Sequence, residues 1–370
     1  MLQKLIHKED LFQIADAMQF GELHFKTDAK TGLRAVIAIH NTNLGPALGG
    51  CRCVAYDSTE AAIYDALRLA QGMSYKAAIS GIAHGGGKSV LIKPAHIADR
   101  DAYFEAFGAF VDTLGGRYIT AVDSGTSVSD MDIIARKTRH VVSTSNNAGG
   151  KGDPSPYTSH GVLRGIQAGV KFSKGTDDLS GVHVAIQGGG NVGYNLAKEL
   201  SQLGARLTMC DNKPETVARF AKEFGAESVD KEKIFDVECD VFAPCARGGV
   251  LTHEVIKRLK TGIIAGGANN QLADPSVGEA IQKRGIVYAP DYVINAGGLI
   301  QVSLDDEQLI MEKVSGIYDS LLNIFKQSKD YKQPSNVVAD RIAREIIDHA
   351  GGATQPSGTG PVPINKSAVC

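Results

Sequence analysis

The sequence predicts an α/β protein of two domains, the second of which contains a doubly wound parallel sheet. Three observations lead to this prediction. The chain has 370 residues, more than the roughly 250 to 300 at which a single hydrophobic core stops growing. Its composition, 43% hydrophobic and 22% charged, is that of an ordinary globular chain. Apolar runs typical of strands alternate with amphipathic helical patterns along most of its length.

The chain begins with an amphipathic pattern that carries charges throughout, over residues 1–20, and this pattern predicts a first helix. A hairpin is predicted next, over residues 22–41, because alternating apolar residues flank a turn around Lys30 and Gly32.

A helix is predicted to follow, since Asp57 and Glu60 form a capping-box-like start. Its apolar face ends near Lys76, which we expect just beyond the last turn. Apolar runs at residues 88–93 and 117–123 then flank another helical stretch. The first domain is therefore predicted to be α/β.

The composition changes near residue 145, where the segment SNNAGGKGDPSPYTS indicates a linker or a site loop. A regular series of strands and helices follows, as expected for a parallel sheet. We predict a first domain at residues 1–145 and a second at residues 146–329. Residues 330–370 are predicted to return to the first domain as part of a long helical pattern, followed by a disordered tail rich in Gly, Pro and Ser.

Charge and composition narrow the functional classes. A net charge of -2 and a pI near 6.6 give no basic footprint for nucleic acid. No apolar run is long enough to cross a membrane and the start does not resemble a signal peptide, so we expect a cytoplasmic protein without a membrane partner. The six cysteines lack the spacing of a zinc site, so we expect reduced thiols and no metal.

The segment HVAIQGGGNVG predicts a dinucleotide site. Gly188, Gly190 and Gly193 end an apolar strand and open a helix, where backbone NH groups can bind a pyrophosphate. Asp211 ends the next strand and would accept hydrogen bonds from the adenosine ribose, which favours NAD over NADP. Lys213, two residues later, leaves NADP open. The alternative is that these glycines only close the turns of a Rossmann sheet.

The segment GGGK, which ends at Lys88, indicates a lysine delivered into a tight pocket without side chains. Alone it is more typical of a solvated surface lysine. Lys76 lies upstream at the end of a helix, and Asp123 ends a strand, where α/β proteins place reactive groups. A lysine that is buried or lies near a second cation loses its proton more readily and can act as a base. Such a cluster suits a substrate with a carboxylate and an amine.

Nine ordered segments resemble the leucine, phenylalanine and valine dehydrogenase family, which is related to glutamate dehydrogenases. They are GPALGGCR, LRLAQGMSYK, GGGKSVLIK, VDSGTSVSDMD, GDPSPYTSHGV, VAIQGGGNVG, APCARGG, AGGANNQLADP and YAPDYVINAGGLI. The resemblance covers roughly residues 10 to 345 and implies the reversible NAD-dependent oxidative deamination of an L-amino acid. It also implies a homo-oligomer, in which we expect the N-terminal helix and the hairpin to contact other subunits.

The resemblance also assigns roles to residues. Lys76 would bind the substrate carboxylate, Lys88 would be the catalytic amine that assists water attack on an iminium, and Asp123 would shuttle protons. The implied remaining substrate contacts are Leu48, Gly49, Gly50, Met73, Ala121, Asn295, Leu299 and Val302. Besides the glycines and Asp211, the implied cofactor contacts are Asn191, Val192, Thr158, Cys245, Ala246 and Asn269. Cys245 could instead serve packing, and several of the others loop capping.

Apolar residues around the predicted substrate side chain disfavour glutamate, whose second carboxylate would have no partner. Choice among aliphatic and aromatic substrates depends on differences worth only about 1 to 3 kcal/mol. We predict leucine and related branched chains, with phenylalanine or tryptophan as the alternative. Val122, Ser124 and Arg247 depart from the family pattern. The changes beside Asp123 keep open a third possibility, a catalytically silent NAD-binding regulator.

Overall fold

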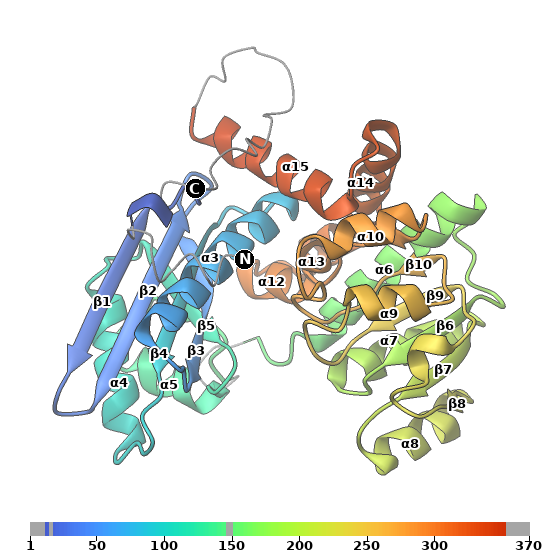
Figure 1. Ribbon diagram of the computed structural model, residues 1–370. Coiled ribbons are helices and arrows are strands. Elements are labelled where there is room, and N and C mark those ends of the chain that lie inside the picture. The colour runs from blue at the N-terminus through green and yellow to red at the C-terminus, as the bar shows by residue number, and fades with distance from the viewer. Residues whose placement is uncertain (1–11, 15–17, 146–150, 353–370) are drawn as a thin grey trace, which may run out of the picture.

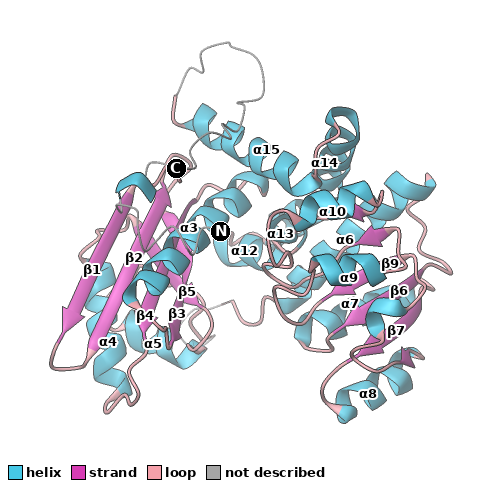
Figure 2. Cartoon of the chain, in the orientation of Figure 1, coloured by secondary structure: helices cyan, strands magenta, loops and turns pink. Residues whose placement is uncertain are grey.

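The computed structural model describes residues 12–14, 18–145 and 151–352, and it contains two sheets covered by helices (Figure 1; Figure 2). Most of the amphipathic N-terminal pattern and nearly all of the C-terminal tail, for which we predicted a helix and disorder, lie outside the described residues. The two sheets stand side by side, with the first on the left of Figure 1 and the second on the right.

The first sheet has five strands in the order β1-β2-β4-β3-β5. β1 and β2 form the predicted antiparallel hairpin, and its turn contains Gly32 with φ of 75°. β3 lies between β4 and β5 and runs parallel to both. The strands are β1 (Glu22–Asp28), β2 (Leu33–Asn41), β3 (Ala47–Val54), β4 (Gly85–Ile92) and β5 (Tyr118–Val122).

Helices cover both faces of this sheet because its strands are apolar on both sides. Val90 of β4 packs in the cluster that contains α3 (Thr59–Ile79), whereas its neighbour Leu91 packs with the aromatic residues of α4 (Arg100–Asp112). This alternation follows from the two-residue period of a strand. α5 (Val128–Ala135) lies beside α4. The first sheet therefore has an α3 face and an α4 face.

Two predictions about α3 are wrong in detail. Its N-cap is Ser58, whose side chain accepts from the amide of Ala61, so Asp57 and Glu60 do not form the capping box. Serine at this position satisfies an otherwise free amide. Lys76 lies in the last turn of the helix instead of beyond it.

The second sheet has six strands, all parallel, in the order β11-β10-β9-β6-β7-β8, which confirms the doubly wound prediction. The strand order reverses direction between β6 and β9, the usual position of a ligand crevice in such sheets. The strands are β6 (His183–Gln187), β7 (Arg206–Cys210), β8 (Glu227–Ser228), β9 (Val241–Pro244), β10 (Ile263–Ile264) and β11 (Val287–Tyr288).

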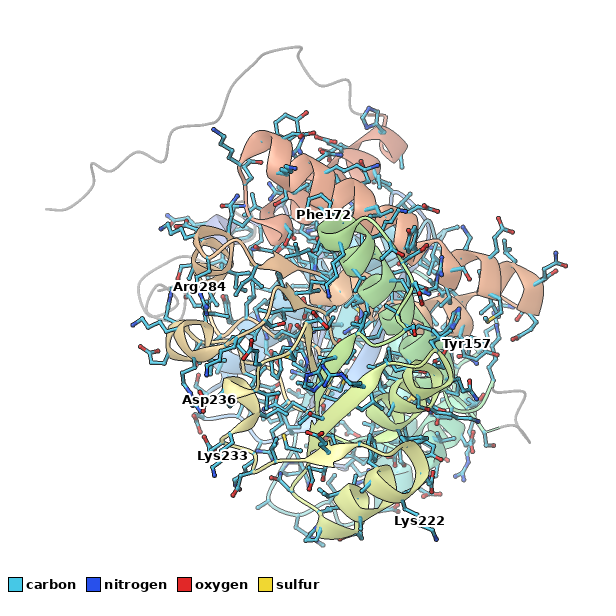
Figure 3. All side chains as sticks on the ribbon, turned by 90° about the vertical axis from the view of Figure 1, so that its right-hand side faces the viewer. Tyr157, Phe172, Lys222, Lys233, Asp236 and Arg284 are labelled. Atoms are coloured by element: carbon cyan, nitrogen blue, oxygen red, sulfur yellow. The ribbon has the colours of Figure 1, made fainter. Side chains whose placement is uncertain are left out.

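Helices also cover both faces of the second sheet. Val184 packs in the cluster with α6, α7 and α14, and its neighbour Ala185 packs in the cluster with α9 and α10. In Figure 3, Tyr157 and Phe172 mark the two ends of α6. The helices are α6 (Ser155–Lys174), α7 (Asn191–Gln202), α8 (Pro214–Phe224), α9 (His253–Arg258), α10 (Val277–Lys283) and α14 (Ile317–Tyr331), with the short 3-10 helix η2 (Ile234–Asp236).

The C-terminal helical pattern is divided into separate helices, with Gly316 before α14 and Pro334 before α15. Proline has no backbone NH and clashes with the preceding helical turn, so a helix ends before it. α15 (Ser335–Ala350) returns to the first sheet and packs on α3 through Ala343 and Ile347 (Figure 1). The domain limits themselves stay a prediction. The remaining helices are α11 (Asp291–Ile294), α12 (Gly297–Ser303) and α13 (Glu307–Ser315).

In the part of the chain that the structure describes, no helix has both the length and the apolar character needed to cross a bilayer.

Candidate active site

The predicted catalytic residues share the α3 face of the first sheet. Lys88 lies on β4 two residues before Val90 and therefore points to the same side. A Cβ atom added to Gly50 of β3 would lie 2.7 Å from Cβ of Asp123 and 3.1 Å from Nζ of Lys88. The sheet thus brings Lys88 and Asp123 together over a glycine that leaves room for both.

The glycines before Lys88 belong to a strand. Gly85, Gly86 and Gly87 are part of strand β4, and none has a positive φ. They are required for close packing instead: a Cβ at Gly86 would lie 2.0 Å from the amide nitrogen of Ser74 on α3. The absence of side chains therefore lets α3 lie directly on the strand that carries Lys88.

Lys88 and Asp123 form a buried ion pair. The Lys88 ammonium, whose side chain is only 7% exposed, forms an ion pair with Oδ2 of Asp123. The same oxygen lies 3.4 Å from Nε of Arg52, and Ser124 donates weakly to Oδ1 at 3.4 Å. Burial raises the pKa of the Asp123 carboxyl, but Lys88 and Arg52 outweigh burial and hold that pKa below its usual value. Asp123 is therefore a carboxylate held between two cations.

Lys76 lies close enough to this pair to interact with both of its charges. Burial lowers the pKa of Lys76, and the positive charge of Lys88 acts in the same direction, while Asp291 and Asp123 oppose the change; the resulting pKa is about 8. Burial raises the pKa of Asp291, and Lys76 opposes that rise. Asp291 begins α11 in the C-terminal half of the chain, so charges from both halves act on Lys76.

The predicted apolar substrate contacts belong to one hydrophobic cluster. It joins Leu48 of β3 to Leu299 of α12, and it also includes Met73 and Val302, which are partly exposed. Gly49, Gly50 and Ala121 lie in β3 and β5. The cluster extends from the α3 face of the first sheet into the core of the second domain. An apolar substrate side chain would therefore find apolar partners from both domains.

The predicted dinucleotide turn is formed as expected. Gly188 has φ of 99°, and a Cβ at Gly193 would lie 2.1 Å from the carbonyl oxygen of Gly188. Gly190 is the N-cap residue of α7, so no side chain accepts from the first amides of this helix. Asn191 and Val192 open α7. Free amides at a helix N-terminus, beside a turn that only glycine can form, fit a pyrophosphate.

Asp211 supports the turn from the next strand. Its Oδ2 accepts from the amide of Gly189 at 2.8 Å, and its Oδ1 accepts from the amide of Lys213 at 2.9 Å. The carboxylate is thereby fixed beside the glycine turn. Its predicted contact with a ribose remains a prediction.

The other predicted cofactor contacts lie around the same crevice. Ala246 contacts Gly188, and Nδ2 of Asn295 donates to Oδ1 of Asn269 at 2.6 Å, while the Oδ1 of Asn295 is buried without a hydrogen-bond partner. Thr158 donates to the carbonyl of Pro154 at 3.2 Å, as expected for a capping role. Asn295 thus offers a free acceptor at the join between the domains.

Cys245 fits the packing interpretation. Its sulfur accepts from the amide of Gly267 at 3.4 Å, and burial raises its pKa to about 11. A thiol with so high a pKa is a poor nucleophile at neutral pH. The described cysteines are all free, and no cluster of three metal-ligating side chains occurs among the residues that the structure describes.

Two charged residues of the site escaped the sequence analysis. Arg52 is two residues after Gly50, so strand alternation alone places it on the same face. Asp291 lies in the segment DYVINAGG, but only the fold brings it near Lys76. The strand face of Arg52 could have been found from the sequence, whereas its position beside Asp123 and the position of Asp291 beside Lys76 depend on the fold.

Comparison with known families matches both parts of this site. Residues 18–140 match the Glu/Leu/Phe/Val dehydrogenase, dimerisation domain, and residues 206–331 match the Glutamate/Leucine/Phenylalanine/Valine dehydrogenase family. The chain belongs to this family of amino-acid dehydrogenases. The predicted resemblance and the predicted enzyme class are therefore confirmed.

Individual relatives cover nearly the whole chain. Leucine dehydrogenase from Geobacillus stearothermophilus is 47% identical over 94% of this chain and 96% of its own length. Leucine dehydrogenase from Thermoactinomyces intermedius is 48% identical over 91% and 93%. The crystal structure of L-tryptophan dehydrogenase from Nostoc punctiforme is similar with a TM-score of 0.83 at 40% identity, and covers 92% of this chain and 99% of that one. This dehydrogenase is thus similar to enzymes named for aliphatic and for aromatic amino acids.

Proposed function

We propose that the protein catalyses the reversible NAD-dependent oxidative deamination of a branched-chain L-amino acid, with leucine preferred, to the 2-oxo acid and ammonia. The observation that carries the proposal is the buried ion pair of Lys88 and Asp123, which faces Lys76 and an apolar cluster. The identity of 47% to a leucine dehydrogenase supports the choice of substrate.

Lys76 would bind the substrate carboxylate. With a pKa of about 8, it is mostly protonated at neutral pH and can form an ion pair. The substrate carboxylate would take the place of the water that the Lys76 ammonium loses on burial. A hydrogen bond between two charged groups is strong in such a buried place. Substrate binding should therefore stabilise the charged form of Lys76.

Lys88 and Asp123 would handle protons at the reacting carbon. NAD, when bound, would supply the acceptor for the hydride of the substrate Cα. Lys88 would first give a proton to Asp123. The neutral amine would then accept a proton from the water that attacks the iminium carbon, and the resulting ammonium would stabilise the developing oxygen charge. Asp123 would carry protons to and from the departing nitrogen. Their direct contact provides the path between the two groups.

The glycine turn at residues 188–193 and the N-terminus of α7 would hold the pyrophosphate of NAD. Asp211 would bind the adenosine ribose and disfavour a 2′-phosphate. Asn295, whose buried Oδ1 has no hydrogen-bond partner, would accept from the substrate amine. Leu48, Met73, Leu299 and Val302 would surround an aliphatic side chain. We further propose that the enzyme is a cytoplasmic homo-oligomer, since residues 18–140 match a dimerisation domain.

The test measures NADH formation by the purified protein with a panel of L-amino acids. We expect leucine, valine or isoleucine to give the highest kcat/KM, and Lys88→Ala to lower kcat by about 10³-fold or more. Lys93→Ala, which removes an exposed lysine just beyond the same strand, is the matched control and should be as active as the natural protein. A higher kcat/KM for phenylalanine or tryptophan would mean that the substrate is an aromatic amino acid and not leucine. No turnover on any amino acid would support a silent regulator.

A further inference from the structure

Arg52 is the third charged group at the Lys88 and Asp123 pair. It lies on β3, the strand between the one that carries Lys88 and the one that ends at Asp123. Its Nε atom is buried and lies 3.4 Å from Oδ2 of Asp123, and its side chain is 21% exposed. No other described arginine lies within ion-pair distance of Asp123.

The far end of Arg52 is fixed by α3. Its Nη1 donates to Oδ2 of Asp65 at 2.8 Å, and the same oxygen accepts from the hydroxyl of Tyr56 at 2.7 Å. Asp65 is itself only 18% exposed. Because a guanidinium is planar and carries five donors, one arginine can bridge two carboxylates. Arg52 therefore connects the catalytic carboxylate to the middle of α3.

We propose that Arg52 is a positioning residue, which fixes the orientation of the Asp123 carboxylate and keeps it charged beside Lys88. This inference rests on the proposed function, since it matters for catalysis only if Asp123 carries protons. Arg52 points to the outer side of the pair: its guanidinium also lines a surface cleft of about 440 Å³ with Tyr56, Asp65 and Arg68. It therefore acts on the reaction through Asp123.

Electrostatics give this role a measurable sign. Lys88 and Arg52 hold the pKa of Asp123 below its usual value. A cation next to this carboxyl favours its deprotonated form. Removing Arg52 should therefore move the lower limb of the pH profile upward. The charged and titratable groups that act on Asp123, or on which it acts, are Lys88 from β4, Arg52 and Cys51 from β3, Lys76 from α3 and Tyr118 from β5.

The experiment compares pH profiles of kcat/KM for L-leucine with NAD. For Arg52→Gln we expect the lower limb to move upward by about 0.5 to 1 pH unit, and kcat/KM below that limb to fall about three- to tenfold. Arg68→Gln is the matched control: it removes the same charge from the same carboxylate, Asp65, at 3.5 Å, but has no ion pair with Asp123. Its profile should coincide with that of the natural protein.

Arg52→Lys separates charge from geometry. A lysine keeps the positive charge but cannot bridge both carboxylates. We expect its lower limb to stay in place while kcat falls several-fold at unchanged KM for leucine. If Arg52→Gln does not fold, this fall in kcat carries the test. Wild-type kcat in Arg52→Lys, an unshifted limb in folded Arg52→Gln, or an equal shift in Arg68→Gln would each overturn the proposal.

The outcome is separable from that of the proposed function. Asp123→Asn is assayed in parallel and should lose most activity. No turnover of leucine by the natural protein would refute the proposed function, and full activity in Asp123→Asn would refute the role assigned to Asp123, whatever the arginine variants do. An inactive Asp123→Asn together with a wild-type profile in Arg52→Gln would refute only the role of Arg52.

Discussion

The two sheets contribute to the site in different ways. In the first, the functional groups are charged side chains on β3, β4 and the end of β5, buried and paired with one another. In the second, they are backbone amides of a glycine turn and of the α7 N-terminus, supported by one carboxylate, Asp211. The first sheet therefore depends on the exact packing of side chains, and the second on the path of the backbone.

Glycine serves both arrangements for different physical reasons. In the first sheet, Gly49, Gly50 and Gly86 have extended backbones and are needed because other atoms occupy the space of a side chain. In the second, Gly188 adopts a positive φ that other residues rarely adopt. A glycine pattern in a sequence therefore does not by itself distinguish tight packing from an unusual turn.

The largest effect should come from Gly49→Ala, which tests whether packing controls the first sheet. Its new Cβ would lie 1.7 Å from the backbone carbonyl oxygen of Gly87, so the strands must separate. We expect a loss of about 3 kcal/mol in the free energy of unfolding, measured by urea denaturation. In Gly50→Ala the close neighbours of the new Cβ are Asp123 and Lys88. We therefore expect this variant to lose activity, measured as kcat, with a smaller loss of unfolding free energy than Gly49→Ala.

Gly72→Ala provides the control for these variants. Gly72 lies in α3 and has no atom within 4 Å of an added Cβ. Alanine there should raise stability by about 0.5 to 1 kcal/mol, because glycine is a poor helix former. Equal stability of the Gly49 and Gly72 variants would show that the first sheet adapts to added volume, contrary to the comparison.

The unequal success of the sequence analysis follows from this contrast. The glycine turn, the strand before it and Asp211 lie within 29 consecutive residues, 183–211, and each has a local pattern. The parallel sheet and the crevice could therefore be predicted. The pairing of Lys88 with Asp123 was inferred from strand ends and from the family resemblance, and the fold brings them together.

Features that depend on strand order could not be predicted. Nothing local indicates that β3 inserts between β4 and β5, which is what puts Arg52 beside Asp123. The packing of the glycines before Lys88 against α3 could not be predicted because their partners, such as Ser74, are distant in sequence. Asp291 acts on Lys76 only because α11 lies beside α3.

A pair of variants in the second sheet should have an intermediate effect. In Gly193→Ala the new Cβ would lie 2.1 Å from the carbonyl of Gly188, so we expect a loss of about 2 kcal/mol in unfolding free energy. In Gly190→Ala nothing lies within 4 Å, and φ is -66°. Its thermal midpoint should be unchanged, whereas its affinity for NAD, measured by titration calorimetry, should fall about tenfold because the pyrophosphate approaches the backbone there. Unchanged NAD affinity in this variant would argue against backbone recognition.

The smallest effect is expected between the two sheets, at the buried carboxyl of Asp340. Among the described residues, this carboxyl has no pair of cations beside it like the pair at Asp123. Asp340 of α15 accepts from the hydroxyl of Tyr292 at 2.8 Å, and burial raises its pKa to about 6, with Asp291 adding to the rise while Tyr292 and Arg344 oppose it. A folded-state pKa above the unfolded one means that this group stabilises the protein fully below about pH 4 and less as pH rises through about 6.

Asp340→Asn should remove that dependence, since the amide oxygen can still accept from Tyr292. Urea denaturation should give equal free energies of unfolding for the variant and the natural protein near pH 4, and a variant more stable by roughly 1 to 2 kcal/mol near pH 7. A difference that stays constant over this pH range would mean that Asp340 keeps its charge in the folded protein at pH 4. Two cations hold the carboxylate of Asp123 in its charged form, whereas burial and the charge of Asp291 favour the neutral form of Asp340. The join would thus show the cost of a buried carboxylate that the first sheet offsets with Lys88 and Arg52.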